Sequence, residues 1–414
     1  MTKGKEDKSQ QFSPQGNPWL NRTVFGAGIA SFFSDLSHEA VTVLLPSFML
    51  LIGAPVYALG MIEGISDGAS SFMKLFSGHY ADRMGKRKGF ALFGYLSTAV
   101  FPLFLAIAAS WPMVLFGRVV GWIGRGIRGP PRDAILAKSV EERHLGKAFG
   151  FHRAGDTLGA IAGPLIALAL VGSVGVREVF WLAIIPGFFA LLSFWLLVSE
   201  KSPAPSGEKR TLISSVRALP ARFMQFLSAV LVFGIADFSH TLLIAFAIVS
   251  LTPSLGFVSA TAAGAALYVV RNIVYAIASY PFGALGDRFG RWTMLIGGYS
   301  MAVVAFLGFI VSPPDLILYG ILFALCGAFI AAEDTLESAV AAELVEDRSR
   351  GLGFGVLATV NGIGDLVSSI LMGLIWAFVG YTAGFLFAAI FATTGMLLLI
   401  GVHAKDPSRP EPDK

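Results

Sequence analysis

Apolar residues recur along this chain in runs close to twenty residues long. About 20 residues of α-helix are needed to cross the roughly 30 Å hydrocarbon core of a bilayer. The content of 55% hydrophobic and only 14% charged residues fits burial in lipid, because soluble proteins carry about 25% charged residues. The pattern therefore predicts an all-α membrane protein with twelve transmembrane helices. The predicted helices cover residues 23–51, 56–80, 89–109, 112–136, 147–171, 178–199, 223–251, 257–281, 292–312, 315–342, 351–376 and 380–402.

Polar stretches divide these helices into two groups of six. The longest polar break between helices, residues 201–222, is rich in proline and serine and is interpreted as a cytoplasmic linker. It separates an N-terminal six-helix bundle, residues 23–200, from a C-terminal six-helix bundle, residues 223–402. The polar residues 1–22 lack the apolar core of a signal peptide and are interpreted as a cytoplasmic N-tail. Residues 403–414 are interpreted as a cytoplasmic C-tail.

The basic residues predict the orientation of the helices in the membrane. Most of the 31 lysines and arginines lie in the two tails, the linker and the turns on the same side, whereas only Arg177 lies in the turns on the opposite side. Cytoplasmic loops carry an excess of Lys and Arg, so both termini are expected in the cytoplasm. The net charge of +4 is then a consequence of topology, and no nucleic-acid partner is expected.

Motifs for enzymatic chemistry are absent or out of context. Residues 124–129, GRGIRG, match a dinucleotide-binding loop, but they follow no strand and lie in a predicted membrane helix. Residues 64–68, GISDG, match a nucleophile elbow without the required strand and turn. The single cysteine, Cys326, excludes an internal disulfide and a cysteine metal site. No cofactor, metal site or enzyme activity is expected.

Two short motifs occur once in each half of the chain. Residues 78–87 read GHYADRMGKR and residues 283–291 read GALGDRFGR, each in the turn after the second helix of its group. Residues 34–38 read SDLSH and residues 236–240 read ADFSH, each within the first helix of its group. Such self-similarity indicates that the two halves arose from one ancestral unit.

The turn motifs resemble the hallmark of the major facilitator superfamily, G-x-x-x-D-R-x-G-R-R/K. Arg118, in LFGRVVGWIGRG, is similar to the fourth-helix pattern of that family. The resemblance implies an MFS fold of two pseudo-symmetric halves that transports a solute by alternating access. It also implies gating by residues of the turns and by a charged partner at the inner end of the fourth helix. These residues are Asp82, Arg83, Lys86, Asp133, Asp287 and Arg288.

The fifth predicted helix is similar to a glycine pattern of the family's exporters. The similarity rests on Gly150, Gly159, Gly163 and Pro164, and the last two glycines of the pattern are missing. It implies a bendable seam that seals the transport cavity. The alternative is close packing between helices, because small residues four apart let two helix backbones approach each other.

Ionisable residues inside the predicted helices are the candidate machinery. Each charged group at the centre of a lone helix costs about 2.5–3.5 kcal/mol on insertion scales, so these groups must face one another or water. Coupling-ion sites lie near the bilayer midplane in two-repeat transporters, and a carboxylate removed from water binds a proton more readily. The alternatives are pairing with arginines of the fourth or fifth helix, or a polar bridge between helices. The proton-coupling candidates are Asp35, His38, Glu39, Glu63, Asp67, His152, Asp156, Asp237 and His240.

Four arginines share one side of the fourth predicted helix. They are Arg118, Arg125, Arg128 and Arg132. The internal repeat maps Arg128 and Arg132 onto Glu333 and Glu337, which predicts an ion-pair gate between the halves. Alternatively, the two outer arginines bind an anionic substrate through their guanidinium groups. The substrate-cavity candidates are Arg118, Arg125, Arg271, Asn361 and Asp365.

Together these features predict a monomeric secondary transporter of the cytoplasmic (inner) membrane. Its expected partners are the lipid bilayer, protons and a small organic solute, which it exports as a proton-driven antiporter. One alternative is a proton-coupled importer, or symporter, of an organic anion or siderophore, which the helix 4 arginines and the missing glycines favour. Another is a receptor or scaffold without transport, which the many buried charges disfavour.

Overall fold

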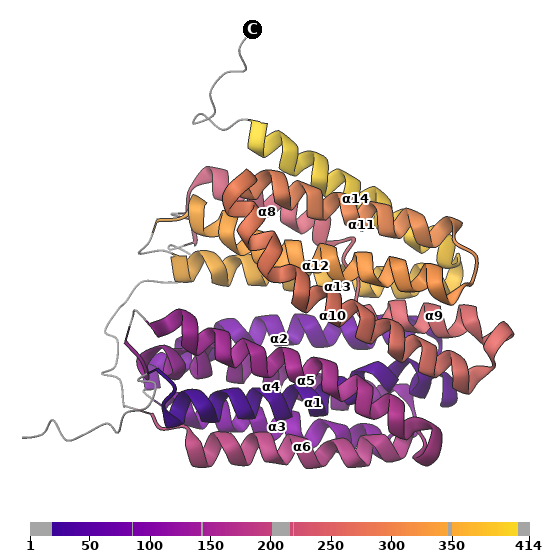
Figure 1. The fold of residues 1–414 in the computed structure, drawn as a ribbon, viewed down its shortest axis with the longest axis horizontal. Coiled ribbons are helices and arrows are strands. Elements are labelled where there is room, and N and C mark those ends of the chain that lie inside the picture. The colour runs from indigo at the N-terminus through magenta and orange to yellow at the C-terminus, as the bar shows by residue number, and fades with distance from the viewer. Residues whose placement is uncertain are drawn as a thin grey trace, which may run out of the picture.

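The computed structural model describes residues 19–84, 86–141, 144–200, 216–217, 219–346 and 350–404. Over these residues the chain forms thirteen long helices and no strand (Figure 1). The helices are α1 (Arg22–Leu51), α2 (Val56–Met84), α3 (Arg87–Ala106), α4 (Trp111–Lys138), α5 (Leu145–Val174), α6 (Val176–Leu197), α8 (Ala221–Gly234), α9 (His240–Leu255), α10 (Phe257–Phe289), α11 (Arg291–Val311), α12 (Leu316–Leu344), α13 (Arg350–Phe378) and α14 (Tyr381–Ala404).

Local sequence explains where several of these helices begin and end. The side chain of Asn21 accepts hydrogen bonds from the backbone of Thr23 and Val24, and so caps the start of α1. Asp315 caps α12 in the same way. Gly175 and Gly256 each have a positive φ, of 97° and 77°, and reverse the chain between α5 and α6 and between α9 and α10.

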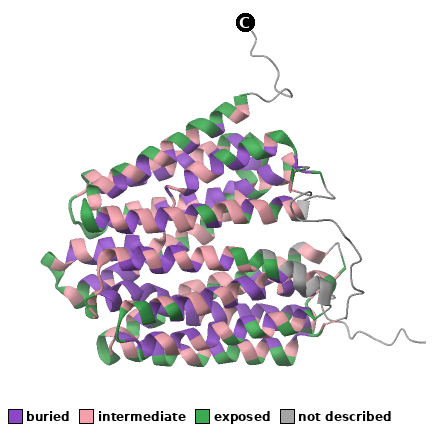
Figure 2. Ribbon diagram, turned by 180° about the vertical axis from the view of Figure 1, so that it is seen from behind, coloured by how far each residue is buried: buried purple, intermediate pink, exposed green. Residues whose placement is uncertain are grey.

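Eight of the helices in the described part are long and apolar enough to span a membrane, and α8 and α9 are shorter apolar helices. Large apolar side chains are exposed on the outside of the molecule, among them Phe93, Trp181, Phe188 and Trp195. In water such a surface would be unfavourable. Figure 2 shows buried residues where helices face one another and exposed residues along the outer sides, as expected for a protein surrounded by lipid.

Helices α1 to α6 lie together in the lower part of Figure 1, and α8 to α14 lie together above them. The two groups meet closely where α2 crosses α13. A Cβ atom added to Gly60 of α2 would clash with the backbone of Ser369 and Gly373 in α13. Only glycine therefore permits this close approach between the groups.

The prediction of one continuous helix over residues 223–251 is wrong. Helix α8 ends at Gly234 and α9 begins at His240, so Asp237 lies outside both helices. Two serines of α13 bond the backbone groups that the break frees: Ser368 Oγ donates to the carbonyl of Asp237 at 2.8 Å, and Ser369 Oγ accepts from the amide of Ser239 at 3.0 Å. The break is stable because its polar groups remain paired away from water.

The glycines of α5 pack against α1. A Cβ atom on Gly155, Gly159 or Gly163 would run into the α1 backbone, whereas one on Gly150 would meet nothing within 4 Å. The packing interpretation therefore explains three of these glycines. A seam that bends during transport remains a prediction, and Pro164 lies inside the otherwise continuous helix.

Candidate functional site

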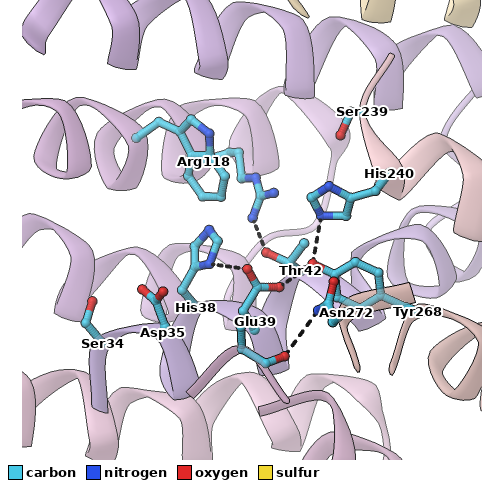
Figure 3. Close-up of polar contacts among 12 residues, drawn as sticks. Ser34, Asp35, His38, Glu39, Thr42, Arg118, Ser239, His240, Tyr268 and Asn272 are labelled. Carbon is cyan, nitrogen blue, oxygen red and sulfur yellow. Dashed lines mark hydrogen bonds and ion pairs between the residues drawn. The ribbon is translucent and has the colours of Figure 1, made fainter. Parts of the chain in front are cut away.

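A buried charge pair forms the centre of the polar network. Arg118 of α4 is fully buried, and its Nη2 lies 3.0 Å from both Oε1 and Oε2 of Glu63 in α2. Its Nη1 donates to Thr42 of α1 at 2.8 Å (Figure 3), and its guanidinium carbon lies 3.4 Å from the ring centre of Trp122. Both of its terminal nitrogens are thus occupied by protein groups, which leaves Arg118 little capacity for a substrate.

Glu39 connects the two groups of helices. His38 Nδ1 lies 3.3 Å from Glu39 Oε1, and the hydroxyl of Tyr268 in α10 donates to Glu39 Oε2 at 2.7 Å (Figure 3). The same hydroxyl lies 3.2 Å from Nε2 of His240, whose ring stacks on that of Tyr268. The structure therefore brings together His38, Glu39 and His240, three of the residues that the sequence predicted for proton coupling.

A second bridge runs from Glu63 to the break between α8 and α9. Ser239 Oγ donates to Glu63 Oε2 at 3.0 Å. Asp67, one helical turn further along α2, accepts from Trp122 Nε1 at 2.5 Å. Glu63 therefore contacts both groups of helices, whereas Asp67 is hydrogen-bonded within the first group.

The remaining candidates of the first group form a separate cluster with the inner arginines of α4. Arg128 pairs with Asp35 at 3.6 Å and donates to Ser34 and to Thr98. His152 binds Ser31 at 2.7 Å. The other contacts are His152 Nδ1 to Asp156 at 3.5 Å and Arg132 to Asp133 at 2.9 Å. Asp35 is thus paired with a helix 4 arginine, as the structural alternative predicts.

Glu333 and Glu337, the acids expected to complete the gate, both lie on α12 in the second group of helices. Glu337 of α12 accepts from Tyr299 at 2.5 Å and from Asn361 at 2.8 Å, while Arg128 and Arg132 contact residues of the first group. Among the described residues of 19–141 and 219–404, neither arginine forms a hydrogen bond or an ion pair with Glu333 or Glu337. The gate remains a prediction for another conformation.

The turn motifs are only partly described. The side chains of Asp82 and Arg83 lie outside the described residues. Lys86 and Arg288 are exposed, and Asp287 pairs with Arg291 at 2.9 Å. Their gating role stays a prediction.

Two cationic candidates remain more available than Arg118. Arg125 is half-buried, 6.0 Å from the ring centre of Trp122, and forms no hydrogen bond or ion pair within the described residues. Arg271 of α10 donates to Asn272 at 3.2 Å, and Asn272 donates across the interface to the carbonyl of Ala160 in α5 at 3.2 Å. Over the same described ranges, no group of His, Cys, Asp and Glu side chains could hold a metal ion.

The site also contains Tyr268, Trp122 and Ser239, which were not predicted from the sequence. In the helix predicted at 257–281, Arg271 and Asn272 follow Tyr268 by three and four residues, and Tyr275 follows Asn272 by three, so the four share one side. This polar side of the helix is the sequence pattern that indicates Tyr268 as a candidate. Trp122 follows Arg118 by four residues, so α4 alone places the two side chains together, whereas the contact of Trp122 with Asp67 depends on the packing of α2 against α4.

The fold and the buried network define a multi-pass helical membrane protein. The chain belongs to the Major Facilitator Superfamily, whose family model matches residues 27–270 and 229–414. The resemblance seen in the turn motifs is thereby confirmed, and with it a role in transport of the MFS type.

Curated relatives and solved structures agree with this assignment. The chain is 31% identical over 407 residues to the uncharacterized MFS-type transporter MJ1317 of Methanocaldococcus jannaschii, covering 97% of this chain and 100% of the relative. It is 26% identical to the multidrug resistance protein MdtG of Enterobacter lignolyticus, over 90% of this chain and 88% of the relative.

Two solved structures share the fold at low sequence identity. A bacterial homologue of the human lysosomal transporter Spinster, in an inward-facing and occupied conformation, has a TM-score of 0.76 and 17% identity, covering 96% of this chain and 100% of that one. The nucleoside transporter NupG has a TM-score of 0.76 and 14% identity, covering 92% and 98%.

Proposed function

We propose that this protein is a proton-driven exporter of a small organic solute. In this proposal α8 and α9 together form one crossing, so that twelve crossings build two six-helix bundles, residues 23–200 and 223–402. The linker 201–222 and the tails 1–22 and 403–414 are cytoplasmic, and the protein works as a monomer in the cytoplasmic membrane. The distribution of lysines and arginines supports this orientation.

The observation that carries the proposal is the position of Glu39. Glu39 is 7% exposed, and its carboxylate lies beside His38 in the first group of helices and accepts a hydrogen bond from Tyr268 in the second. Hydrogen bonds to a charged acceptor are about twice as strong as neutral ones. Binding of a proton to Glu39 would weaken this link, and a change of charge would thereby alter the contact between the halves.

The contacts between the halves support an inward-facing state. Ser47 with Thr261 and Gly60 with Gly373 lie toward the ends of α1 and α2 that the topology places outside, and Glu39 with Tyr268 lies near the middle of α1. Toward the other end, Arg128 and Arg132 form no hydrogen bond or ion pair with Glu333 or Glu337 in the described part of the chain. The cytoplasmic end, where these gate residues lie, would open and close as the two halves rock about the central site.

Two observations bear on the direction in which the solute is transported. The relatives named as multidrug resistance proteins favour export. Arg125 is half-buried and forms no hydrogen bond or ion pair in the described part of the chain, which favours the alternative of an importer for an organic anion.

Purified protein in proteoliposomes containing a trapped pH indicator tests the proposal. An antiporter moves protons into the vesicle as solute leaves, and an imposed proton gradient drives the solute in the opposite direction. Co-directional movement of proton and solute would instead establish the importer. Absence of flux and of proton movement for a broad panel of cationic, neutral and anionic solutes would favour the receptor or scaffold.

A further inference from the structure

An apolar groove lies between α3 and α6 on the outer face of the first group of helices. Helix α6 forms the lower edge of that group in Figure 1, with α3 beside it. The groove has a volume of about 470 Å³, and its lining includes Leu92, Phe93 and Leu96 of α3 and Phe188, Leu192 and Trp195 of α6. Phe93 and Trp195 are each 57% exposed. An apolar surface of this kind marks a site that lipid or another protein covers.

The groove lies at the depth of one leaflet of the membrane. The start of α3 and the end of α6 lie together, because Nζ of Lys88 donates to the carbonyl of Trp195 at 2.8 Å. Leu96, the groove residue of α3 furthest from this end, follows Lys88 by eight residues, or about 12 Å along a helix. One leaflet contributes roughly 15 Å of hydrocarbon. The groove therefore has a length suited to the acyl chains of a lipid.

A polar cavity adjoins the end of the groove at which Lys88 lies. It has a volume of about 270 Å³ and lies among the start of α1, the start of α3, the end of α4 and the residues that follow α6. Arg22 lines the cavity, and its Nη2 donates to the carbonyl of Leu196, the residue after Trp195 of the groove, at 2.9 Å. The cavity and the groove are therefore contiguous.

Positive charge predominates in this cavity. Among its described lining residues are three basic ones and one acidic one, namely Arg22, Arg87, Lys138 and Glu200. The carboxylate of Glu200 already accepts from two backbone amides at the start of α3, those of Arg87 at 2.8 Å and of Lys88 at 2.9 Å. Arg22 and Lys138 are exposed and form no ion pair within the described residues. The cavity is thus suited to an anionic group.

The second group of helices differs at the equivalent positions. The repeat that aligns Asp82 with Asp287 places Trp292 at the position of Arg87 and Glu343 at the position of Lys138. A carboxylate at the latter position repels an anion at short range. These basic residues of the cavity are therefore particular to the first group and are not explained by the orientation of the protein alone.

We propose that the groove and the cavity together bind one anionic phospholipid of the cytoplasmic leaflet. Its acyl chains lie in the groove, and its phosphate lies at the cavity, where Arg22 and Lys138 balance the charge. The choice of leaflet follows from the proposed orientation, whereas the site does not depend on the proposed transport. A second copy of this chain is less suited to the groove, since it would place its own basic cavity at the same level, where like charges repel.

Native mass spectrometry of the purified full-length protein in detergent tests this site, because it counts both the bound lipids and the copies of the chain. The probes are dioleoylphosphatidylglycerol, which is anionic, and dioleoylphosphatidylcholine, which has the same acyl chains and no net charge. Wild-type protein should bind phosphatidylglycerol about tenfold more tightly. Arg22→Gln combined with Lys138→Gln should weaken that binding about thirtyfold, which corresponds to about 2 kcal/mol, and should leave phosphatidylcholine unchanged.

Three further variants complete the experiment. Lys147→Gln combined with Arg217→Gln removes two other exposed charges that are predicted on the same side, and should bind as wild type does. Leu192→Trp narrows the groove and should weaken both lipids alike. Leu397→Trp, the same change at the equivalent and likewise exposed position of the second group, should not.

Equal affinity of the wild type for the two lipids would overturn the proposal, and so would unchanged binding in the folded double variant of the cavity or in Leu192→Trp. Displacement of phosphatidylglycerol by inorganic phosphate would overturn it by indicating an anion site without a lipid. A dimer that excludes lipid would assign the groove to a second copy of the chain instead. Should the double variant fail to fold, Lys138→Glu, which gives this position the charge of Glu343, carries the same expectation.

Discussion

Replacing Arg118 by leucine removes one partner of the most deeply buried ion pair. The side chains of Arg118 and Glu63 are 0% and 1% exposed, and Nη2 lies 3.0 Å from the carboxylate. Leaving a buried charge without its partner costs about 3–5 kcal/mol. The lost hydrogen bond to Thr42 and the lost contact with the Trp122 ring act in the same direction.

The melting temperature should therefore fall markedly. At about 2 °C per kcal/mol for a large domain, the expected decrease is about 6–10 °C. Cys326 provides the assay, because it is the single cysteine, is buried on α12 and becomes reactive toward a thiol-specific fluorogenic dye on unfolding. Circular dichroism should follow the helices in parallel, since Arg118 and Cys326 lie in different groups of helices.

Two variants control this experiment. Arg291→Leu breaks an ion pair of similar length, 2.9 Å to Asp287, whose side chains are 38% and 68% exposed, so its cost should stay below about 1 kcal/mol. Arg118→Leu combined with Glu63→Leu removes both charges and should recover much of the lost stability. The reasoning is refuted if Arg118→Leu melts like Arg291→Leu by both measurements, or if the double variant is no better than the single one.

Three further predictions follow from the site and the packing. Glu39→Gln should abolish uphill transport in proteoliposomes while downhill exchange continues, because glutamine keeps a hydrogen-bond acceptor but cannot change charge; equal loss of both activities would indicate a structural role. Arg132→Glu should impair transport, and adding Glu337→Arg should restore part of it; no recovery would exclude that gate. Gly159→Ala should lower the melting temperature by several degrees, because its Cβ would meet the α1 backbone, whereas Gly150→Ala should not; equal melting would contradict the packing argument.

The membrane helices could be read from the sequence because their cause is local. Each of the twelve predicted ranges contains helix, and most ends agree within a few residues. The periodicity of α1 likewise places Asp35, His38 and Glu39 on the polar side of one helix. Their partners could not be read in this way, because Tyr268 and Arg128 reach them only after α10 and α4 have packed against α1.

The two copies of the repeated motif likewise differ in a way that only the tertiary structure shows. From the sequence alone, SDLSH at 34–38 and ADFSH at 236–240 are equivalent, yet α1 continues through the first and the helix breaks at the second. The repeat that aligns Asp82 with Asp287 also aligns Ser368 and Ser369 with Gly163 and Pro164.

Serine hydroxyls of α13 can bond the backbone groups that a break would free, whereas glycine and proline at the equivalent places in α5 offer no such side chain. The apolar runs thus determined that helices form and where they lie along the chain, since each helix satisfies its own backbone. Whether one of these helices could be interrupted depended on a neighbouring helix that bonds the backbone groups freed by the break. Only the tertiary structure brings that neighbour into contact.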